Sequence, residues 1–221
     1  MGLRRDPLIV SQDMGRPGRK SWLGAMRRST AGNRRARVLA HHLAEAMPHR
    51  GTVLDFGYGD GAVAAALTAT RRDLQVSSDD AATRTWGHIA ATEYDGEALP
   101  FVTGSFDYVT LVDVLHHARN PFAVLAEATR LASRGVVVKD HLREGILAKP
   151  TLQLMERIGD GARHKLSAPH YFDRAEWDGF FRRSGCDILS WREKLGLYPA
   201  PASWLFDRHL HFIAVIMQGA R

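Results

Sequence analysis

Cysteine is nearly absent from this chain of 221 residues, since Cys186 is the only one. An internal disulfide is therefore excluded, and nothing in the cysteine content points to an oxidising compartment. No apolar run approaches the roughly 20 residues that a membrane-spanning helix needs. The short apolar segment Leu8–Val10 is also too small for the core of a signal peptide. These absences predict a cytoplasmic protein without a transmembrane segment.

Acidic side chains are scarce at the N-terminus. Residues 1–37 hold ten basic and two acidic side chains, a net charge of +8, whereas the whole chain carries +6. We therefore expect a basic N-terminal arm or lid over 1–37 and one α/β domain over 38–221, which carries a net −2. The arm has three interpretations: a solvated tail, a grip on an anionic partner such as nucleic acid, a phosphorylated substrate or anionic lipid, or a transit peptide.

The most informative segment is a glycine-rich turn. Val53 and Leu54 are typical of the end of a buried strand, and the run Ala62–Leu67 is typical of a helix that begins directly after the turn. The turn itself is formed by Gly57, Gly59 and Gly61. Glycine accepts backbone angles that other residues resist, and a helix N-terminus favours an anionic ligand group. Strand, glycine turn and helix in this order predict the nucleotide-binding half of an open α/β sheet.

Two interpretations of this turn compete. Gly57-x-Gly59-x-x-Ala62 fits the loose dinucleotide fingerprint of NAD-dependent dehydrogenases, which is a weak signal alone. The residues that follow add an acid about 20 positions past the turn, where it accepts hydrogen bonds from ribose hydroxyls. We prefer Asp80 for this role over its neighbour Asp79. A dehydrogenase does not need the stretch Asp95-Gly-Glu-Ala-Leu-Pro-Phe101 that comes next.

Read together, these ordered motifs resemble the class I S-adenosylmethionine-dependent methyltransferases over about residues 50–142. The resemblance implies S-adenosylmethionine as the cofactor, with Asp95 at the adenine amino group and Asp80 at the ribose. It implies the following cofactor-binding residues: Asp55, Gly57, Gly59, Gly61, Asp80, Asp95, Gly96 and Asp113. It also implies the Rossmann-like methyltransferase fold, an open, doubly wound, mostly parallel seven-stranded sheet with helices on both faces and an antiparallel last strand.

Other patterns predict the remaining elements. Asn120 and Pro121 are a favourable helix start, and Asp173 with Glu176 predicts a capping box. The predicted segments are a helix over 38–47, a helix that ends at Arg134-Gly135, a buried strand at Val136–Val138, a helical pattern over 142–158 interrupted by Pro150, and strands over 187–191 and 210–217. His209 and His211 share a face of the last strand, but no further ligand is placed beside them, so no metal site is predicted.

Candidate proton acceptors follow two of the predicted strands. Ligands bind at the carboxyl ends of strands in such sheets. These candidates are His116 and His117 after one strand, Lys139, Asp140 and His141 after the next, and His170 and Tyr171 further on. Imidazole titrates near neutral pH, so we select His116 and His141 as the candidate catalytic residues.

The favoured function is methyl transfer to a small-molecule acceptor. Methylation of RNA or another macromolecule through the basic arm is the alternative, and a non-catalytic cofactor-binding module is a third. Nucleic acid is not favoured as a partner, because Trp22 is the only aromatic residue among the basic side chains of the arm. In the resembled family an Asn-Pro-Pro-Tyr-like tetrapeptide after the fourth strand marks methylation of base amino groups, and none is present here.

Overall fold

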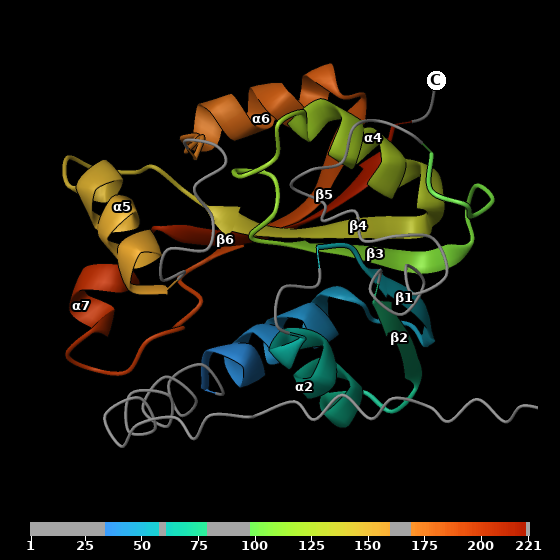
Figure 1. Cartoon of the computed structure of the whole chain (residues 1–221), viewed down its shortest axis with the longest axis horizontal. Coiled ribbons are helices and arrows are strands. Elements are labelled where there is room, and N and C mark those ends of the chain that lie inside the picture. Colours follow the sequence, from blue (N-terminus) through green and yellow to red (C-terminus); the bar gives the residue numbers. More distant parts are fainter. Residues whose placement is uncertain (1–33, 58–60, 79–97, 160–168, 220–221) are drawn as a thin grey trace, which may run out of the picture.

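The computed structural model describes residues 34–57, 61–78, 98–159 and 169–219. These residues form a six-stranded sheet in the order β2-β1-β3-β4-β6-β5 (Figure 1). The strands are β1 (Gly51–Asp55), β2 (Leu74–Ser78), β3 (Phe106–Val112), β4 (Ala132–His141), β5 (Cys186–Glu193) and β6 (His211–Gln218). The helices are one over residues 34–46, then α2 (Ala62–Thr70), α4 (Pro121–Leu131), α5 (Ala148–Gly159), α6 (Arg174–Arg183) and α7 (Ser203–Phe206).

Helices cover both faces of this sheet. In Figure 1, α4 and α6 lie on one side of it, and α2 and the helix over 34–46 lie on the other. Two hydrophobic cores result, and β4 contributes to both. Val136 and Val138 pack into the core beneath α4 and α6, whereas Val137 packs into the other. All three are fully buried, which confirms the predicted strand at this position.

The sheet is mixed. Neighbouring strands are parallel from β2 through β1 and β3 to β4, whereas β6 is antiparallel to both β4 and β5. The last strand, β6, is therefore antiparallel to its neighbours, as the resemblance implied. The described residues contain six strands where the resemblance implied seven. The chain between β2 and β3 includes residues 79–97, which lie outside the description.

Two helix starts follow the sequence signals. The Asn120 side chain accepts a hydrogen bond from the N–H of Ala123, with Pro121 as the first residue of α4. Asp173 and Glu176 form the predicted capping box at the start of α6. The helix predicted over 38–47 extends to residue 34 at its N-terminal side, so 34–37 of the predicted arm belong to this helix.

Two predicted boundaries are wrong. The helical pattern predicted from 142 becomes a helix only at Ala148, because Gly145 has a φ of +89°, which an α-helix does not accommodate. The N–H groups of Leu142 and Arg143 donate to the carbonyls of Leu210 and Phe172 and hold this segment in place. Pro150 then falls in the first turn of α5, where its missing N–H costs nothing. Arg134 and Gly135 do not follow α4 as a turn. They already lie in β4, which begins directly after the helix.

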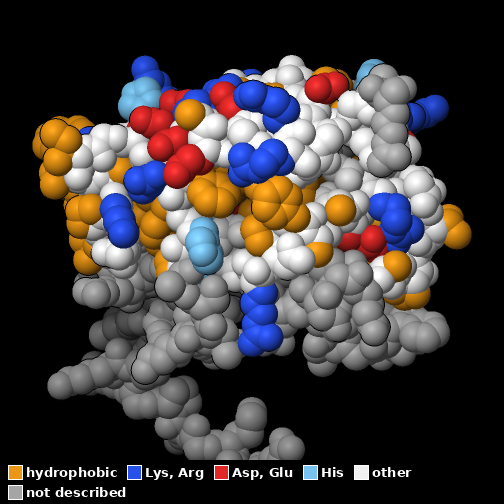
Figure 2. Space-filling view, turned by 90° about the horizontal axis from the view of Figure 1, so that it is seen from above, with side chains coloured by type: hydrophobic (Ala, Val, Ile, Leu, Met, Phe, Trp, Pro, Cys, Tyr) orange, Lys and Arg blue, Asp and Glu red, His pale blue; other side chains and the backbone are white. Residues whose placement is uncertain are grey.

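The face of the molecule seen from above is mixed in charge. Figure 2 shows basic and acidic side chains close together on the face seen from above, with hydrophobic side chains gathered at the left edge. Exposed apolar residues precede α5 at that end of the molecule, where Ile146 is 99% and Leu147 56% exposed. Within the described ranges, no helix has the length and apolar character needed to cross a membrane.

Candidate active site at the carboxyl ends of the parallel strands

The glycine turn follows β1 directly. Gly57 has a φ of +101°, and Gly61, at the N-cap of α2, has a φ of +73°. Both values lie in the left-handed region that favours glycine. Gly61 brings no capping side chain to the helix start. This geometry fits a ligand with anionic or hydroxyl groups placed against the backbone.

Asp55 lies at the end of β1, in the interior of the sheet. Its Oδ1 accepts a hydrogen bond of 2.7 Å from the Thr110 hydroxyl, so the carboxylate joins β1 to β3. Four of the sequence-predicted cofactor residues lie outside the described residues, namely Gly59, Asp80, Asp95 and Gly96, and so does Asp79.

The ends of β3 and β4 bring His116 and Asp140 together. Nδ1 of His116 lies 2.6 Å from Oδ1 of Asp140, and the two side chains are 1% and 0% exposed. Two backbone N–H groups fix the carboxylate: that of His141 donates to Oδ1 at 2.7 Å, and that of His116 to Oδ2 at 3.4 Å. Two chain segments that are 24 residues apart thus hold one histidine–carboxylate dyad.

The contact between His116 and Asp140 shifts the pKa values of both side chains. Burial alone would lower the pKa of His116, but the Asp140 carboxylate outweighs it and raises this pKa above its usual value. Burial would raise the pKa of Asp140, but His116 opposes this and lowers it. Asp140 therefore remains ionised at neutral pH, and His116 is a stronger base than free imidazole.

His141 lies against the dyad with a different electrostatic environment. Its ring centroid is 4.6 Å from that of His116 in an edge-to-face arrangement. Its Nδ1 lies 3.6 Å from Asp140 Oδ1 and 3.7 Å from Asp113 Oδ1. Burial, followed by the charges of Lys139 and His116, lowers the pKa of His141 to about 4. His141 is therefore neutral at physiological pH.

Asp113 forms a second cluster beside His141. It follows β3 with a φ of +56°, and its two carboxylate oxygens pair with different cations. Oδ1 accepts from the Lys139 ammonium, and Oδ2 accepts from the Arg35 guanidinium. Burial would raise the pKa of Asp113, but Lys139 and Arg35 together lower it well below its usual range. The cofactor contact that the resemblance implied for Asp113 stays a prediction.

The sequence analysis named Lys139 only as a candidate proton acceptor, and it did not name Arg35 as a site residue. Lys139 is fully buried in β4, directly after three buried valines. A lysine that directly follows three buried valines in a strand indicates a partner of opposite charge, because lysine is almost never fully buried unless it is paired. Arg35 lies in the helix over 34–46, within the segment predicted as the arm, and nothing in its sequence neighbourhood points to Asp113.

His211 is also part of this cluster, whereas His209 is not. Nε2 of His211 lies 3.1 Å from the Phe206 carbonyl oxygen, so Nε2 carries the proton. Its Nδ1 lies 3.4 Å from the Lys139 ammonium and accepts from it. Burial, with the charge of Lys139, holds the pKa of His211 well below its usual range. His209 does not share this face: it lies before β6, 2.9 Å from the Glu193 carboxylate.

The remaining predicted candidates surround the dyad. The His116 ring lies 4.0 Å from that of His117 and 6.0 Å from that of Tyr171, between centroids. The His170 N–H donates to the His116 carbonyl at 2.9 Å. The segment after β3, the end of β4 and the segment before α6 therefore meet at one place, as the sequence predicted for the carboxyl ends of the strands.

One group of residues has the spacing of metal ligands. The ligand atoms of His116, Asp140 and His141 all lie within 4.8 Å of one another, and the three residues are buried. The Asp140 Oδ1 between them already contacts the His116 ring and accepts from the His141 N–H. The positive charge of Lys139 acts on His141 as well. This ammonium would repel a cation bound beside His141.

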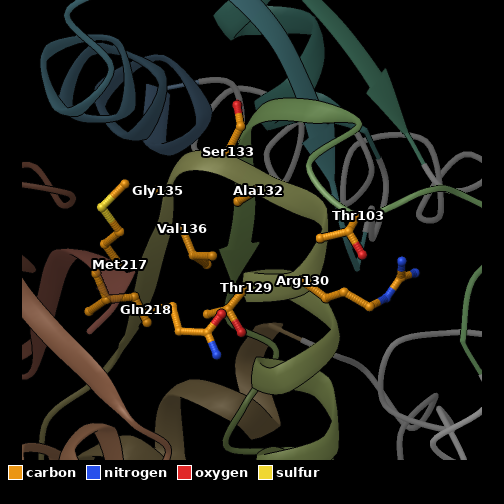
Figure 3. Close-up of a pocket in the computed structure, with 10 residues that line it drawn as sticks. Thr103, Thr129, Arg130, Ala132, Ser133, Gly135, Val136, Met217 and Gln218 are labelled. Carbon is orange, nitrogen blue, oxygen red and sulfur yellow. The ribbon is translucent and has the colours of Figure 1, made fainter. Parts of the chain in front are cut away.

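A surface cavity of about 200 Å³ lies at the other end of β4 (Figure 3). It is lined by the start of that strand, including Ser133 and Gly135, and by Met217 and Gln218 at the end of β6. A ten-residue strand spans roughly 30 Å, and Asp140 and His141 lie at its opposite end. This cavity is therefore separate from the candidate site.

The comparisons with known proteins agree with this geometry. The family model described as a methyltransferase domain matches residues 30–190, which is most of the chain. The chain belongs to the methyltransferase-domain family. It is a class I S-adenosylmethionine-dependent methyltransferase, and S-adenosylmethionine is the cofactor of this family. The family, the enzymatic activity and the cofactor predicted from the sequence are thus confirmed. No curated relative matches the chain.

Solved structures of methyltransferases share the fold of this methyltransferase at low identity. One comes from a complex between the Haloferax volcanii Trm112 methyltransferase activator and a methyltransferase. It has a TM-score of 0.57 and 18% identity, and covers 91% of this chain and 96% of that one. Another is the 1,6-didemethyltoxoflavin-N1-methyltransferase of Burkholderia thailandensis, which binds 1,6-didemethyltoxoflavin and S-adenosylhomocysteine. It has a TM-score of 0.52 and 14% identity, and covers 95% and 94% of the two chains.

Proposed function

We propose that this methyltransferase acts on a small-molecule acceptor and that His116 removes a proton from the acceptor atom. The observation that carries this proposal is the contact between His116 Nδ1 and Asp140 Oδ1, at the carboxyl ends of β3 and β4. Because Nδ1 faces the carboxylate, an acceptor proton would be taken by Nε2. Asp140 would hold the ring and stabilise its positive charge after proton transfer.

The glycine turn is the proposed cofactor cradle. Gly57 and Gly61 would place the backbone and the start of α2 against S-adenosylmethionine, with Gly59, Asp80, Asp95 and Gly96 as further contacts. The bound cofactor supplies an electrophilic methyl group on its sulfonium. The protein would align the acceptor with this group, exclude water and accept the proton. His141 would line the acceptor side in its neutral form, since its pKa is about 4.

Burial supports a small acceptor. His116 is 2%, Asp140 0% and His141 8% exposed, so an acceptor that enters whole reaches them more readily than a group on a macromolecular surface. Two arginines at the end of the basic N-terminal segment also bind other parts of the protein. Arg34 donates to the carbonyls of Gly196 and Leu197, and Arg35 pairs with Asp113. These two cations are therefore not available to nucleic-acid phosphates.

The test combines cofactor binding with methyl transfer. Calorimetry should detect S-adenosylmethionine and S-adenosylhomocysteine but not NAD, and a small-molecule panel with radiolabelled cofactor should identify the acceptor class. His116→Gln should then slow methyl transfer by about 10²–10⁴-fold, the range that general-base catalysis contributes, while cofactor affinity is retained. His41→Gln is the matched control, since His41 is an exposed histidine on the helix over 34–46.

The alternative acceptor, RNA, is tested with the same purified protein. If the substrate is RNA, the full chain should bind RNA with an affinity that falls steeply with salt, and deletion of residues 1–30 should remove this binding while cofactor affinity persists. That result, or an unchanged rate in His116→Gln, contradicts the proposal.

A further inference from the structure

Large apolar side chains are exposed at the end of the molecule that carries α5 and α7. These two helices contact each other, and hydrophobic side chains gather at the same end in the space-filling view (Figures 1 and 2). Ile146 is 99% and Trp204 77% exposed, and Leu147, Leu154 and Leu205 are between 40% and 56% exposed. Single exposed apolar side chains are ordinary, but a group of five on adjacent elements marks an interaction surface. We call these five residues the apolar tip.

The apolar tip lies beside the candidate active site. At the end of α7, the Phe206 carbonyl accepts a hydrogen bond from Nε2 of His211. On the inner side of α5, Leu152 belongs to a small buried cluster against which Tyr171 packs. The Tyr171 ring lies 6.0 Å from that of His116, between centroids. A surface that binds the tip therefore meets the molecule next to the candidate active site.

The basic N-terminal segment joins the described chain beside α7. Arg34 donates to the carbonyls of Gly196 and Leu197. The N–H of Leu197 donates in turn to the carboxylate of Asp207, the residue that follows α7. Residues 1–33, which come directly before Arg34, hold seven basic and two acidic side chains, a net charge of +5. This positive charge is therefore tethered next to the apolar tip.

The tip itself does not neutralise that charge. The stretches that form it, 144–155 and 199–208, hold equal numbers of each sign, namely Lys149 and Arg208 against Glu144 and Asp207. If the N-terminal segment covered the tip, its own charge would stay unbalanced. A second copy of the chain would bring a further segment of the same sign. An anionic bilayer instead offers negative head groups to residues 1–33 and an apolar interior to the tip.

We propose that the apolar tip and residues 1–33 together bind this protein to the surface of a membrane that contains anionic lipids. Trp204 lies at the level of the head groups, where indole rings concentrate, and the isoleucine and leucine side chains enter the apolar layer beneath. Peripheral binding commonly combines two such signals, because either one alone is weak. The inference rests on the exposed surface and on the charge of the chain, and it does not depend on the proposed function.

Vesicle flotation with the full chain tests this binding. Vesicles of phosphatidylcholine mixed with phosphatidylserine are compared with vesicles of phosphatidylcholine alone. The chain should bind the mixed vesicles at least about tenfold more tightly, because each cation near an anionic surface contributes to the attraction. Moderate salt should weaken this preference, since it screens the charges of the segment. Deletion of residues 1–30 should remove the preference.

Substitutions in the tip test the apolar contribution. Leu147→Ser and Trp204→Ser should each weaken the binding to mixed vesicles about tenfold, since each removes apolar surface that the lipid would bury. Leu189→Ser and Val102→Ser are the matched controls. Leu189, on the edge strand β5, is 58% exposed, and Val102, which lies before β3 at the opposite end of the sheet, is 78% exposed. Both controls should bind like the wild type, and thermal unfolding confirms that all four variants are folded.

The inference is overturned if the full chain binds neither kind of vesicle. It is also overturned if the tip variants bind like the wild type, if the controls lose as much binding as the tip variants, or if deletion of residues 1–30 leaves the lipid preference unchanged. Self-association that Leu147→Ser abolishes, in a chain that does not bind vesicles, would assign the tip to a second copy instead. Calorimetry with S-adenosylhomocysteine reports separately on the proposed function, because the tip lies outside the proposed cofactor cradle.

Discussion

Nδ1 of His116 lies 2.6 Å from Oδ1 of Asp140, and both side chains are almost completely removed from solvent. A buried carboxylate at this distance favours the charged imidazolium, which is why the pKa of His116 is raised despite its burial. The same contact fixes the ring, because the two backbone N–H groups of His116 and His141 hold the carboxylate in place. The dyad therefore controls both the basicity and the orientation of His116.

The first prediction concerns the titration of His116. NMR of labelled histidine side chains should show one imidazole that titrates above the usual value of about 6.5. Asp140→Asn removes the carboxylate charge, so the pKa of His116 should fall and burial should then dominate. Methyl transfer requires neutral His116, so its rate should rise with pH through the raised pKa, and this limb should move to lower pH in the variant. An unchanged His116 titration in Asp140→Asn contradicts the dyad.

The second prediction concerns acid stability. His141 has a folded-state pKa of about 4, below the unfolded value, so it contributes stability that is present above about pH 6.5 and lost as the pH falls toward 4. This single group accounts for a loss of about 3 kcal/mol over that window. His116 acts in the opposite sense, because its folded pKa is raised. Urea unfolding at pH 7 and pH 5 should therefore show a smaller acid loss in His141→Gln than in the wild type, whereas His41→Gln should leave the loss unchanged.

The third prediction tests the capping box of α6. Asp173→Ala removes the acceptor for the Glu176 N–H and should lower the free energy of unfolding by about 1 kcal/mol. Asp178→Ala is the matched control on the same helix, where the carboxylate only pairs with Arg174 near the surface. Such a pair contributes about 0.5 kcal/mol or less. Thermal unfolding of both variants distinguishes the contribution of the capping box from that of the surface ion pair. Equal losses of stability in the two variants would contradict a stabilising capping box.

Local signals in the sequence predicted the local features of this fold well. Asn120 with Pro121 and Asp173 with Glu176 act within four residues, so each helix start could be predicted without knowledge of the tertiary structure. The glycine turn after β1 was predictable for the same reason, since a positive φ at Gly57 is a local requirement. The helix predicted from 142 was wrong because Gly145 adopts a φ of +89°, which an α-helix does not accommodate. Hydrogen bonds to the distant residues Leu210 and Phe172 hold the segment before it.

The charged cluster depends on contacts across the chain. Arg35 and Asp113 are separated by 78 residues, and Lys139 and His211 by 72. No periodicity or motif joins such positions, and only the order of the strands brings them together. The sequence predicted that His116, Asp140 and His141 lie at strand ends, but not which of them pair. The contact with Asp140 outweighs burial and raises the pKa of His116, whereas burial, followed by the charges of Lys139 and His116, lowers the pKa of His141.

The fourth prediction is a double-mutant cycle on the Lys139–Asp113 pair. Lys139→Met removes a buried ammonium but leaves Asp113 paired with Arg35, so it should cost less than the roughly 3–5 kcal/mol expected when a buried charge loses its partner. Asp113→Asn leaves Lys139 and Arg35 without an anion. In the double variant both charges are gone, so its cost should fall at least about 1 kcal/mol short of the sum of the single effects. Additive effects in chemical unfolding would show that the contact carries no coupling.

The last prediction separates backbone strain from cofactor binding. Gly57→Ala places a side chain at a φ of +101°, a conformation that L residues rarely adopt. The protein should lose about 1–3 kcal/mol of stability or shift the turn. Because the proposed cradle depends on this turn, S-adenosylmethionine affinity should fall about tenfold or more, which corresponds to roughly 1.4 kcal/mol. Gly145→Ala is the matched control: its φ is +89°, and an added Cβ would meet nothing within 4 Å.

The control carries similar strain at a place outside the proposed cradle. Calorimetry should therefore find the cofactor affinity of Gly145→Ala equal to that of the wild type, although its stability falls as well. If both glycine variants bind S-adenosylmethionine alike, the turn after β1 does not hold the cofactor. If both lose affinity together, global destabilisation explains the loss, because a site that depends on the folded state weakens whenever that state is depopulated. Only a selective loss in Gly57→Ala assigns the cofactor to the carboxyl end of β1.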